Sequence, residues 1–530
     1  MKAITFFDTE IDVQSRKILD IGAIRSDGSV FHSNSLEDFA DFLNGTAFIC
    51  GHNIIKHDLN YVQKNISSRG NPLKFIDTLY LSPLLFPVKP YHSLLKDDKL
   101  QTGELNNPVN DSQKAKDLFF DEVTAFNNLD KYLKQIYFML LKDHAGFSAF
   151  FDYVSFKPSE EALTTALIHS RFHGKICSNA PIEKLIKDSS TEFAYCLALI
   201  NGSDRYSVTP PWVLRSYPEV EKVMHLLRNK PCITGCIYCD EALDAKSGLK
   251  EFFNFNYYRT FNGEPLQEQA VNAAINNKSL LAVFPTGGGK SLTFQVPALM
   301  AGRNTKGLTV VISPLQSLMK DQVDNLEKLG INESATINGL LDPIERGKSF
   351  ERVEDGSVSL LYISPESLRS KTIERLLLGR NIVRFVIDEA HCFSAWGQDF
   401  RVDYLYIGDF IKQLQEKKNL PDPIPVSCFT ATAKQNVIAD ICGYFGEKLS
   451  LRLEIFKANS TRKNLTYKVF DSKDEEDKYN KTRILIETKN CPSIIYVSRT
   501  GRAYKLAERL CKDGFNAKPY HGKMDVKEKT

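Results

Sequence analysis

The run Thr286-Gly287-Gly288-Gly289-Lys290-Ser291 most constrains what this chain can fold into. It follows an apolar stretch, 279–283, that is typical of a buried strand, and it precedes 292–299, which opens as a helix. Glycines between a strand and a helix let backbone N–H groups approach phosphate oxygens, and the helix N-terminus adds its positive dipole end. We therefore expect a phosphate-binding loop in which Lys290 contacts the outer phosphates and Ser291 holds Mg²⁺. A glycine turn without a ligand is the alternative, because the full pattern has another glycine where Phe284 stands.

Downstream of this loop, apolar runs alternate with helical segments. Near-continuous apolar strands between helices indicate a parallel sheet that is covered on both faces, with ligands at the carboxyl ends of the strands. Asp388 and Glu389 directly follow one such strand, so Asp388 is placed to hold magnesium and Glu389 to polarise the attacking water. A surface turn is the alternative for this pair. The predicted strands are 308–313, 360–363, 383–387 and 425–429.

Near the N-terminus, two acids lie two residues apart at the end of a predicted strand, 4–7, and a second strand is expected at 17–24. Side chains in a strand repeat every second residue, so Asp8 and Glu10 lie on one face. Joined by two more aspartates, such a pair can hold two Mg²⁺ ions for in-line attack on a phosphodiester. A solvated surface carboxylate is the alternative for any one of these acids.

Most of residues 1–125 resembles the DEDD family of three-prime exonucleases, which implies an RNase H-like fold and a metal-dependent nuclease. The histidine subgroup of that family has a histidine five residues before its last aspartate, where this chain has Asn106. Asparagine cannot accept a proton, although bound metals would still acidify the attacking water. The resemblance therefore predicts metal binding and leaves catalysis open. The four acidic positions of the family are occupied here by Asp8, Glu10, Asp58 and Asp111, the last at the start of a predicted helix over 112–120.

The region 126–250 is predicted to be mostly helical and contains one cluster of cysteines, Cys232, Cys236 and Cys239. Thiolates this close in sequence can share a zinc ion or an iron–sulfur cluster. Three reduced, partly buried cysteines without a metal are the alternative. A tetrahedral site needs a fourth ligand, for which the sequence offers Cys177, Cys196 or His173. The predicted helices cover 126–141, 160–169 and 220–227.

Composition limits the cellular compartment and the partners that we expect for this chain. Its 530 residues suffice for three or four domains, and its net charge of +3 does not by itself indicate nucleic acid, so any such binding must come from local grooves. The 11 cysteines are scattered apart from one cluster, which suits reduced thiols. No apolar run is long enough to span a bilayer, and acids interrupt the first residues, so we expect a cytoplasmic protein without a membrane partner.

The segment from 251 onward resembles RecQ-type DNA helicases of superfamily two, which use ATP and Mg²⁺. Gln267 matches the glutamine that reads adenine, and the box Asp388-Glu389-Ala390-His391 matches motif II. Ser313 and Gln316 match the motif that grips a DNA strand.

The segment after the box resembles the aromatic-rich loop that couples single-stranded DNA to ATP hydrolysis in RecQ proteins. Trp396 and Phe400 can stack on bases of any sequence, and Arg401 favours an exposed loop. An aromatic cluster in the core is the alternative.

The predicted architecture is α/β throughout. It comprises an exonuclease-like domain, 1–125; a mostly helical region, 126–250; a first RecA-like lobe, 251–460; and the start of a second RecA-like lobe, 461–530. In the last region we expect strands at 493–499 and 516–520 around a helix at 502–510. Motifs that follow in the family, including its arginine finger, have no counterpart there. We therefore expect a fragment of a longer protein that binds ATP but unwinds DNA poorly.

The sequence thus favours an ATP-dependent DNA helicase of RecQ type that acts on single-stranded and forked DNA, joined to a metal-dependent exonuclease domain. A DNA-stimulated ATPase that translocates without unwinding is one alternative. A non-enzymatic DNA-binding fragment is another, although intact Lys290, Asp388 and Glu389 argue against it.

Overall fold

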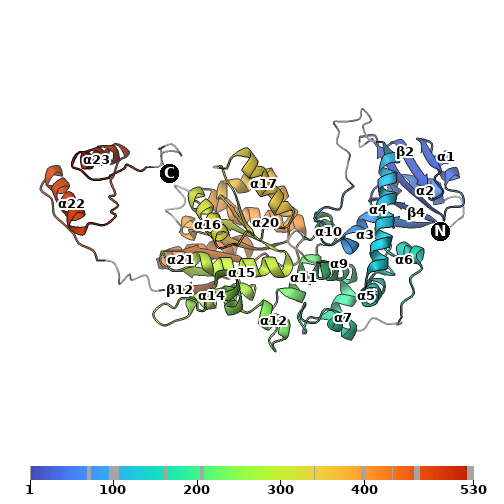
Figure 1. The fold of residues 1–530 in the computed structure, drawn as a ribbon, viewed down its shortest axis with the longest axis horizontal. Helices are drawn as coiled ribbons and strands as arrows, with labels where there is room; N and C mark the ends of the chain where they lie inside the picture. Colours follow the sequence, from blue (N-terminus) through green and yellow to red (C-terminus); the bar gives the residue numbers. More distant parts are fainter. Residues whose placement is uncertain are drawn as a thin grey trace. The chain divides into compact units, whose positions relative to one another are not determined.

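The computed structural model divides the chain into two compact units, Met1–Ser460 and Thr461–Thr530. Among its described residues, the first unit contains two β-sheets with helices around them (Figure 1). Among the described residues, no helix is both long and apolar enough to cross a membrane. The described residues are 2–12, 14–67, 73–94, 107–159, 165–202, 208–339, 341–394, 402–431, 434–458, 466–521 and 524.

A mixed sheet near the N-terminus has the strand order β3-β2-β1-β4-β5. Its central strand β1 pairs antiparallel with β2 and parallel with β4. Successive side chains of β1 point to opposite faces, so Phe6 packs against Phe119 and Phe7 packs against Phe39. Both faces are therefore covered, and the strands predicted at 4–7 and 17–24 are confirmed. The strands are β1 (Ile4–Ile11), β2 (Ile18–Arg25), β3 (Val30–Ser33), β4 (Phe48–Gly51) and β5 (Lys74–Asp77); the helices beside them are α1 (Leu36–Phe42), α2 (Leu59–Ser67), α3 (Thr78–Leu85) and α4 (Pro108–Asn128).

Helix α4 approaches β2 closely because Gly22 has no side chain. A Cβ atom at Gly22 would lie 2.2 Å from the backbone nitrogen of Val109, which is far inside van der Waals contact. The hydroxyl of Ser112 lies 2.8 Å from the carbonyl oxygen of Gly22 and ties the first turns of the helix to the strand. Gly22 and Ser112 thus allow the close approach of α4 to β2.

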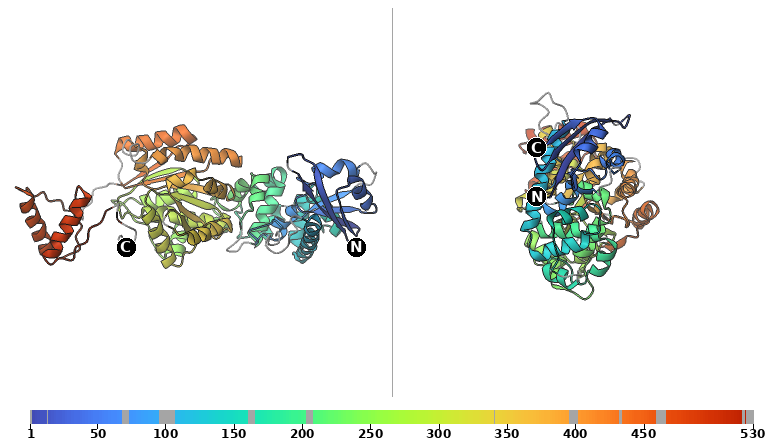
Figure 2. Two further views of the ribbon diagram at one scale, coloured as in Figure 1. Left: turned by 90° about the horizontal axis from the view of Figure 1, so that it is seen from above. Right: turned by 90° about the vertical axis from the view of Figure 1, so that its right-hand side faces the viewer.

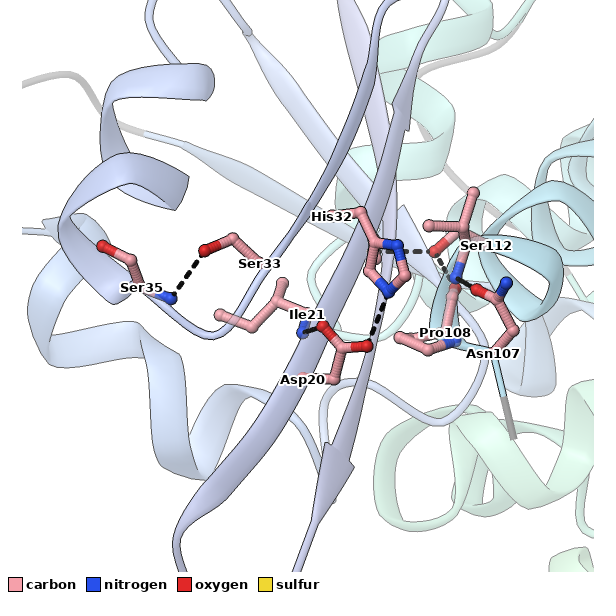
Figure 3. A network of polar contacts seen from close by, with 10 residues as sticks. Asp20, Ile21, His32, Ser33, Ser35, Asn107, Pro108 and Ser112 are labelled. Atoms are coloured by element: carbon pink, nitrogen blue, oxygen red, sulfur yellow. Dashed lines mark hydrogen bonds and ion pairs between the residues drawn. The ribbon is translucent and has the colours of Figure 1, made fainter. Parts of the chain in front are cut away.

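The N-terminus of α4 differs from the prediction. We expected a helix over 112–120, but α4 begins at Pro108, because proline is already set for the first helical position and needs no hydrogen-bonded N–H there. The side chain of Asn107 caps the helix by accepting a hydrogen bond of 3.0 Å from the N–H of Val109 (Figure 3). As a result Asp111 lies in the first turn of the helix, beside the sheet.

The middle region is helical, as predicted, but its first helix is broken. Instead of one helix over 126–141, α4 ends at Asn128, and Asp130 starts a new helix by accepting hydrogen bonds from the N–H groups of Tyr132 and Leu133 at 3.0 and 2.9 Å. The helix predicted over 220–227 is confirmed. The helices are α5 (Lys131–Leu141), α6 (Ser148–Val154), α7 (Thr165–Arg171), α8 (Ile182–Asp188), α9 (Ser190–Gly202), α10 (Pro211–Ser216), α11 (Val220–Arg228), α12 (Ile237–Ala242) and α13 (Ala245–Phe253).

The second sheet of the first unit has seven strands in the order β12-β6-β11-β10-β7-β9-β8. All the neighbouring strands run parallel, which confirms the parallel sheet expected from the apolar runs. The strands are β6 (Leu280–Val283), β7 (Leu308–Ile312), β8 (Ser334–Ile337), β9 (Leu360–Ile363), β10 (Ile382–Ile387), β11 (Val426–Thr430) and β12 (Glu454–Lys457).

Helices cover both faces of this sheet (Figure 1). Residues of β6 alternate between two hydrophobic cores: Leu280 belongs to the core shared with α14 and α15, and Leu281 to the core shared with α18, α20 and α21. Both faces of the strand are buried, which explains why its sequence is apolar at every position. The helices are α14 (Leu266–Ile275), α15 (Lys290–Thr305), α16 (Gln316–Lys328), α17 (Pro343–Glu354), α18 (Lys371–Leu378), α20 (Ile407–Lys418) and α21 (Gln435–Leu449).

The second unit consists, within its described residues, of helices α22 (Glu475–Lys489) and α23 (Thr500–Lys512), drawn in red in Figure 2. The predicted helix over 502–510 is confirmed, but the strands predicted at 493–499 and 516–520 are wrong for this structure. A strand needs a neighbour to accept its backbone hydrogen bonds, and none is present among the described residues of this unit. The apolar side chains of the first segment face solvent instead: Ile494 is 82% exposed and Tyr496 91%.

Candidate functional site

The glycine-rich loop lies between β6 and α15, as predicted. Gly287 and Gly289 have φ angles of +75° and +81°, a region that residues with side chains rarely adopt. A Cβ atom on Gly288 would lie 2.8 Å from the carbonyl oxygen of Pro285. The loop therefore needs glycine at all three positions, and it leads directly into Lys290, the first residue of α15.

Two residues outside the loop hold its backbone in place. The side-chain amide of Gln267 donates a 2.9 Å hydrogen bond to the carbonyl oxygen of Gly289 and accepts one of 2.7 Å from the N–H of Arg259. The guanidinium of Arg259 also donates to the carbonyl oxygen of Gly287. Gln267 is only 1% exposed, so in this structure it supports the loop, and its adenine contact stays a prediction. Sequence reasoning missed Arg259, because no local pattern marks it.

Asp388 lies at the carboxyl end of β10 and faces the residues of the neighbouring strand ends. One of its carboxylate oxygens accepts a 3.3 Å hydrogen bond from the hydroxyl of Ser313, which follows β7. The other accepts a 3.0 Å hydrogen bond from the N–H of Glu389. Burial and the charge of Glu389 raise the pKa of Asp388, and the positive charge of Lys290 opposes that rise. Lys290 and Asp388 therefore act on each other electrostatically at one edge of the sheet.

The residues after Asp388 connect two strand ends. Glu389 has a left-handed backbone, with φ at +48°, and its carboxylate lies 3.2 Å from Nδ1 of His391. The same nitrogen lies 3.1 Å from the hydroxyl of Thr430, the last residue of β11. The imidazole thus bridges the candidate water-polarising group and the next strand of the sheet.

The predicted DNA contacts are only partly within the described residues. Ser313 is 4% exposed and its hydroxyl is directed at Asp388, so this placement groups it with the nucleotide site and does not favour a DNA contact. Gln316 is the first residue of α16 and is half-buried. The DNA roles of both stay predictions. The aromatic loop residues Trp396, Phe400 and Arg401 lie outside the described residues.

Three of the four predicted N-terminal acids come together in space. Oxygens of Asp8, Glu10 and Asp111 all lie within 4.8 Å of one another, at the end of β1 and the first turn of α4. Burial, followed by the charges of Asp58, Asp111 and Glu10, raises the pKa of Asp8 to about 8. Carboxylate oxygens are the ligands that Mg²⁺ prefers, so this donor set fits that ion.

Asp58 is placed differently from the other three acids. Its carboxylate is 2% exposed and accepts a 3.0 Å hydrogen bond from the N–H of Thr9, while its second oxygen lies 3.6 Å from Nδ1 of His57. Its charge still acts on Asp8. Asn106, which stands where the exonuclease subgroup has histidine, lies outside the described residues.

The cysteine cluster gains a fourth member in the structure. The Sγ atoms of Cys177, Cys232, Cys236 and Cys239 all lie within 4.8 Å of one another. Burial alone would raise the pKa of Cys236, but hydrogen bonds from the N–H groups of Cys239 and Ser178, with the neighbouring thiols, lower it to about 7. Of the three fourth ligands that the sequence left open, the structure places Cys177 at the cluster. A donor set of four thiols is able to hold a metal ion.

Comparison with protein families matches residues 264–441 to the family described as DEAD/DEAH box helicase. The match includes both the glycine-rich loop and the box at 388–391, so the chain contains a DEAD/DEAH box helicase domain. It includes neither the acidic cluster nor the cysteine cluster.

Among curated relatives, the chain is similar to ATP-dependent DNA helicase RecQ of Haemophilus influenzae, with 35% identity over 286 residues, or 53% of this chain and 42% of that protein. ATP-dependent DNA helicase RecQ of Bacillus subtilis is 37% identical over 287 residues, or 52% of this chain and 44% of that protein. The chain thus spans less than half the length of these relatives. A solved structure, DEAD-box helicase Mss116 bound to ssRNA and UDP-BeF, is 18% identical with a TM-score of 0.40 over 50% of this chain and 56% of that one.

Proposed function

We propose that this chain binds ATP with Mg²⁺ at the loop 286–291 and couples ATP hydrolysis to movement on single-stranded DNA, as an ATP-dependent DNA helicase of RecQ type. The observation that supports this most is the convergence of Lys290, Asp388 and Ser313 at the carboxyl edge of one parallel sheet. That edge lies inside the segment that matches the helicase family.

Each residue of this edge has a chemical task in the proposal. Lys290 and the loop N–H groups neutralise the phosphates, and Ser291 and Asp388 hold the magnesium ion. Glu389 orients and polarises the attacking water, and His391 links it to Thr430 at the end of the next strand. Magnesium, when bound, offsets the charge that develops on the transferred phosphoryl group.

The test is an ATPase assay of the full chain with and without single-stranded DNA. Lys290→Ala should lower DNA-stimulated turnover by about 10²-fold or more, because the transition state loses a charge that is aimed at the phosphates. Lys328→Ala, an exposed lysine in the last turn of α16, should leave turnover unchanged. Full turnover in Lys290→Ala would refute the assignment of the site.

Translocation without strand separation is the alternative at the same site. A forked duplex assayed beside the single-strand ATPase separates the two activities. Strand displacement, even at the slow rate expected of this chain, supports the helicase, whereas DNA-stimulated ATPase activity with no displacement supports the translocase.

We propose metal-dependent cleavage of DNA from the 3′ end as a second activity, at Asp8, Glu10, Asp58 and Asp111. Three of these acids bring their oxygens within 4.8 Å of one another. Burial, and then the charges of Asp58, Asp111 and Glu10, raise the pKa of Asp8 to about 8. Such a cluster favours a divalent cation, which relieves the repulsion.

A nuclease assay on end-labelled single-stranded DNA with Mg²⁺ or Mn²⁺ tests this second activity. Wild-type protein should shorten the strand from its 3′ end, and Asp8→Asn should abolish shortening. Asp38→Asn, an exposed acid on α1, is the control and should behave as wild type. Equal cleavage by Asp8→Asn and wild type would contradict the proposal.

A further inference from the structure

We propose that Cys177, Cys232, Cys236 and Cys239 bind a single zinc ion, and that this ion fixes helix α12 between the middle helices and the helicase domain. The four sulfur atoms come from two distant parts of the chain, since Cys177 follows α7, whereas Cys232 and Cys236 precede α12 and Cys239 lies in its first turn. A site built entirely from protein thiolates leaves no position for water or substrate, which is typical of structural zinc.

The spacing of the sulfurs distinguishes one ion from a cluster. Zinc–sulfur bonds of about 2.3 Å in a tetrahedron hold the sulfurs about 3.8 Å apart. Here the Sγ atoms of Cys177 and Cys236 are 4.0 Å apart, and all four lie within 4.8 Å of one another. An iron–sulfur cluster places several irons and sulfides between its cysteines and so needs them farther apart. A disulfide bond, at about 2.05 Å, needs them much closer.

The segment between Cys232 and Cys239 has a backbone turn and hydrogen-bond donors that suit metal binding by its cysteines. Gly235 has a φ angle of +74°, which permits the tight turn between the first two cysteines. The side-chain amide of Asn179 donates to the sulfur of Cys232 at 3.3 Å and to the carbonyl oxygen of Gly235 at 3.5 Å. The N–H of Cys239 points at the sulfur of Cys236 at 3.5 Å. Donors directed at ligand sulfurs stabilise thiolates and orient them toward a metal.

The position of α12 indicates what the ion would hold together. On one side, the N–H of Cys177 donates a 2.9 Å hydrogen bond to the carbonyl oxygen of Leu227, at the end of α11. On the other, the carbonyl oxygen of Ala242, the last residue of α12, accepts hydrogen bonds from Asn304 at 3.0 Å and Arg303 at 3.3 Å, both in the last turn of α15. Helix α12 has only six residues and cannot be stable alone, so the metal would supply the fixed point it needs.

The metal content of the full chain, purified without chelators, tests the proposal. We expect about one zinc ion per chain by elemental analysis, and X-ray absorption at the zinc edge should show four sulfur ligands at about 2.3 Å. Cys177→Ser should lose most of the zinc and melt several degrees lower. Cys196→Ser is the matched control, because Cys196 is a buried cysteine of the same region outside the cluster, and it should keep its zinc.

Because Cys177→Ser can fail to fold, the wild-type protein provides a second measurement. A thiol-modifying reagent should release zinc to a metallochromic dye in step with modification of the four cysteines. Iron and sulfide with a visible absorption band after anaerobic purification would overturn the single-ion assignment. Protein without metal that takes up no added zinc under reducing conditions would overturn the site itself.

Discussion

The pKa of the Asp8 carboxyl group depends strongly on the side chains around it. Its carboxyl group is partly buried beside Asp58, Asp111 and Glu10, and its pKa rises from 3.8 to about 8. Below pH 3.8 the group is protonated in both the folded and the unfolded chain, so it does not change the free energy of unfolding. Between these two pH values the unfolded chain ionises and the folded chain does not, so stability falls as pH rises.

We therefore expect Asp8→Asn to be more stable than wild type at pH 8, by an amount on the order of a few kcal/mol, and to show no such gain near pH 4. Thermal melts of both proteins in metal-free buffer at the two pH values measure this difference. Added Mg²⁺ should stabilise wild type at pH 8 but not Asp8→Asn. A gain that is the same at both pH values would mean that the charge of Asp8 is not the cause.

The sequence predicts some residues of the nucleotide site and of the cysteine cluster better than others. Lys290 and Asp388 could be placed from sequence because Lys290 ends the glycine-rich loop that follows one apolar run and Asp388 directly follows another, where a parallel sheet collects its ligands. Arg259 could not, since its contact with the loop depends on how the chain before α14 folds back. Cys177 lies 55 positions before Cys232, and only the placement of the segment after α7 beside the segment before α12 decided between it and Cys196 or His173.

Whole elements were predictable where local pattern and packing agree. The strands β6, β7, β9, β10 and β11 are buried on both faces, so their apolar runs are unambiguous. The same kind of run at 493–499 did not form a strand, because pairing depends on a neighbour that the run itself cannot specify. The break at Asp130 was also missed, since an aspartate within an apolar-periodic stretch looks like a surface residue until its capping bonds are seen.

At this scale the contact between α4 and β2 is open to test through Gly22. Gly22→Ala should destabilise the N-terminal sheet by about 2 kcal/mol or more, because the added Cβ meets the backbone of Val109 and cannot be relieved by a side-chain rotation. It should also weaken stabilisation by Mn²⁺, since α4 carries Asp111. Gly347→Ala, in α17 with open space around it, should be neutral or stabilising. Calorimetry that shows equal effects would contradict this account of the helix position.

At the scale of the whole molecule, the division at 460 and 461 is the one that the structure makes. Boundaries near 125 and 250 stay predictions, and one hydrophobic core continues across both, from Phe6 through the middle helices to Leu299. Sequence composition cannot reveal such continuity, because a buried contact between regions has the same residue types as a core within one region.

We expect a chain that ends at residue 460 to melt within about 2 °C of the full chain, because 461–530 forms a separate unit. A chain that ends at 453 is the control: it also loses β12, which pairs with β6 beside the glycine-rich loop, and it should melt clearly lower. Differential scanning fluorimetry compares the three. A large drop for the first truncation would show that the two units stabilise each other.

Helix α15 has 16 residues, from Lys290 to Thr305, and Asn304 in its last turn bonds to α12. One end of this helix therefore lies at the proposed phosphate site, and the other end contacts the helix that carries part of the proposed zinc site. Free-energy coupling between two ligands is symmetric, so whatever factor zinc applies to nucleotide affinity, nucleotide must apply to zinc affinity. A titration of either ligand in the presence of the other therefore measures the coupling between the two proposed sites.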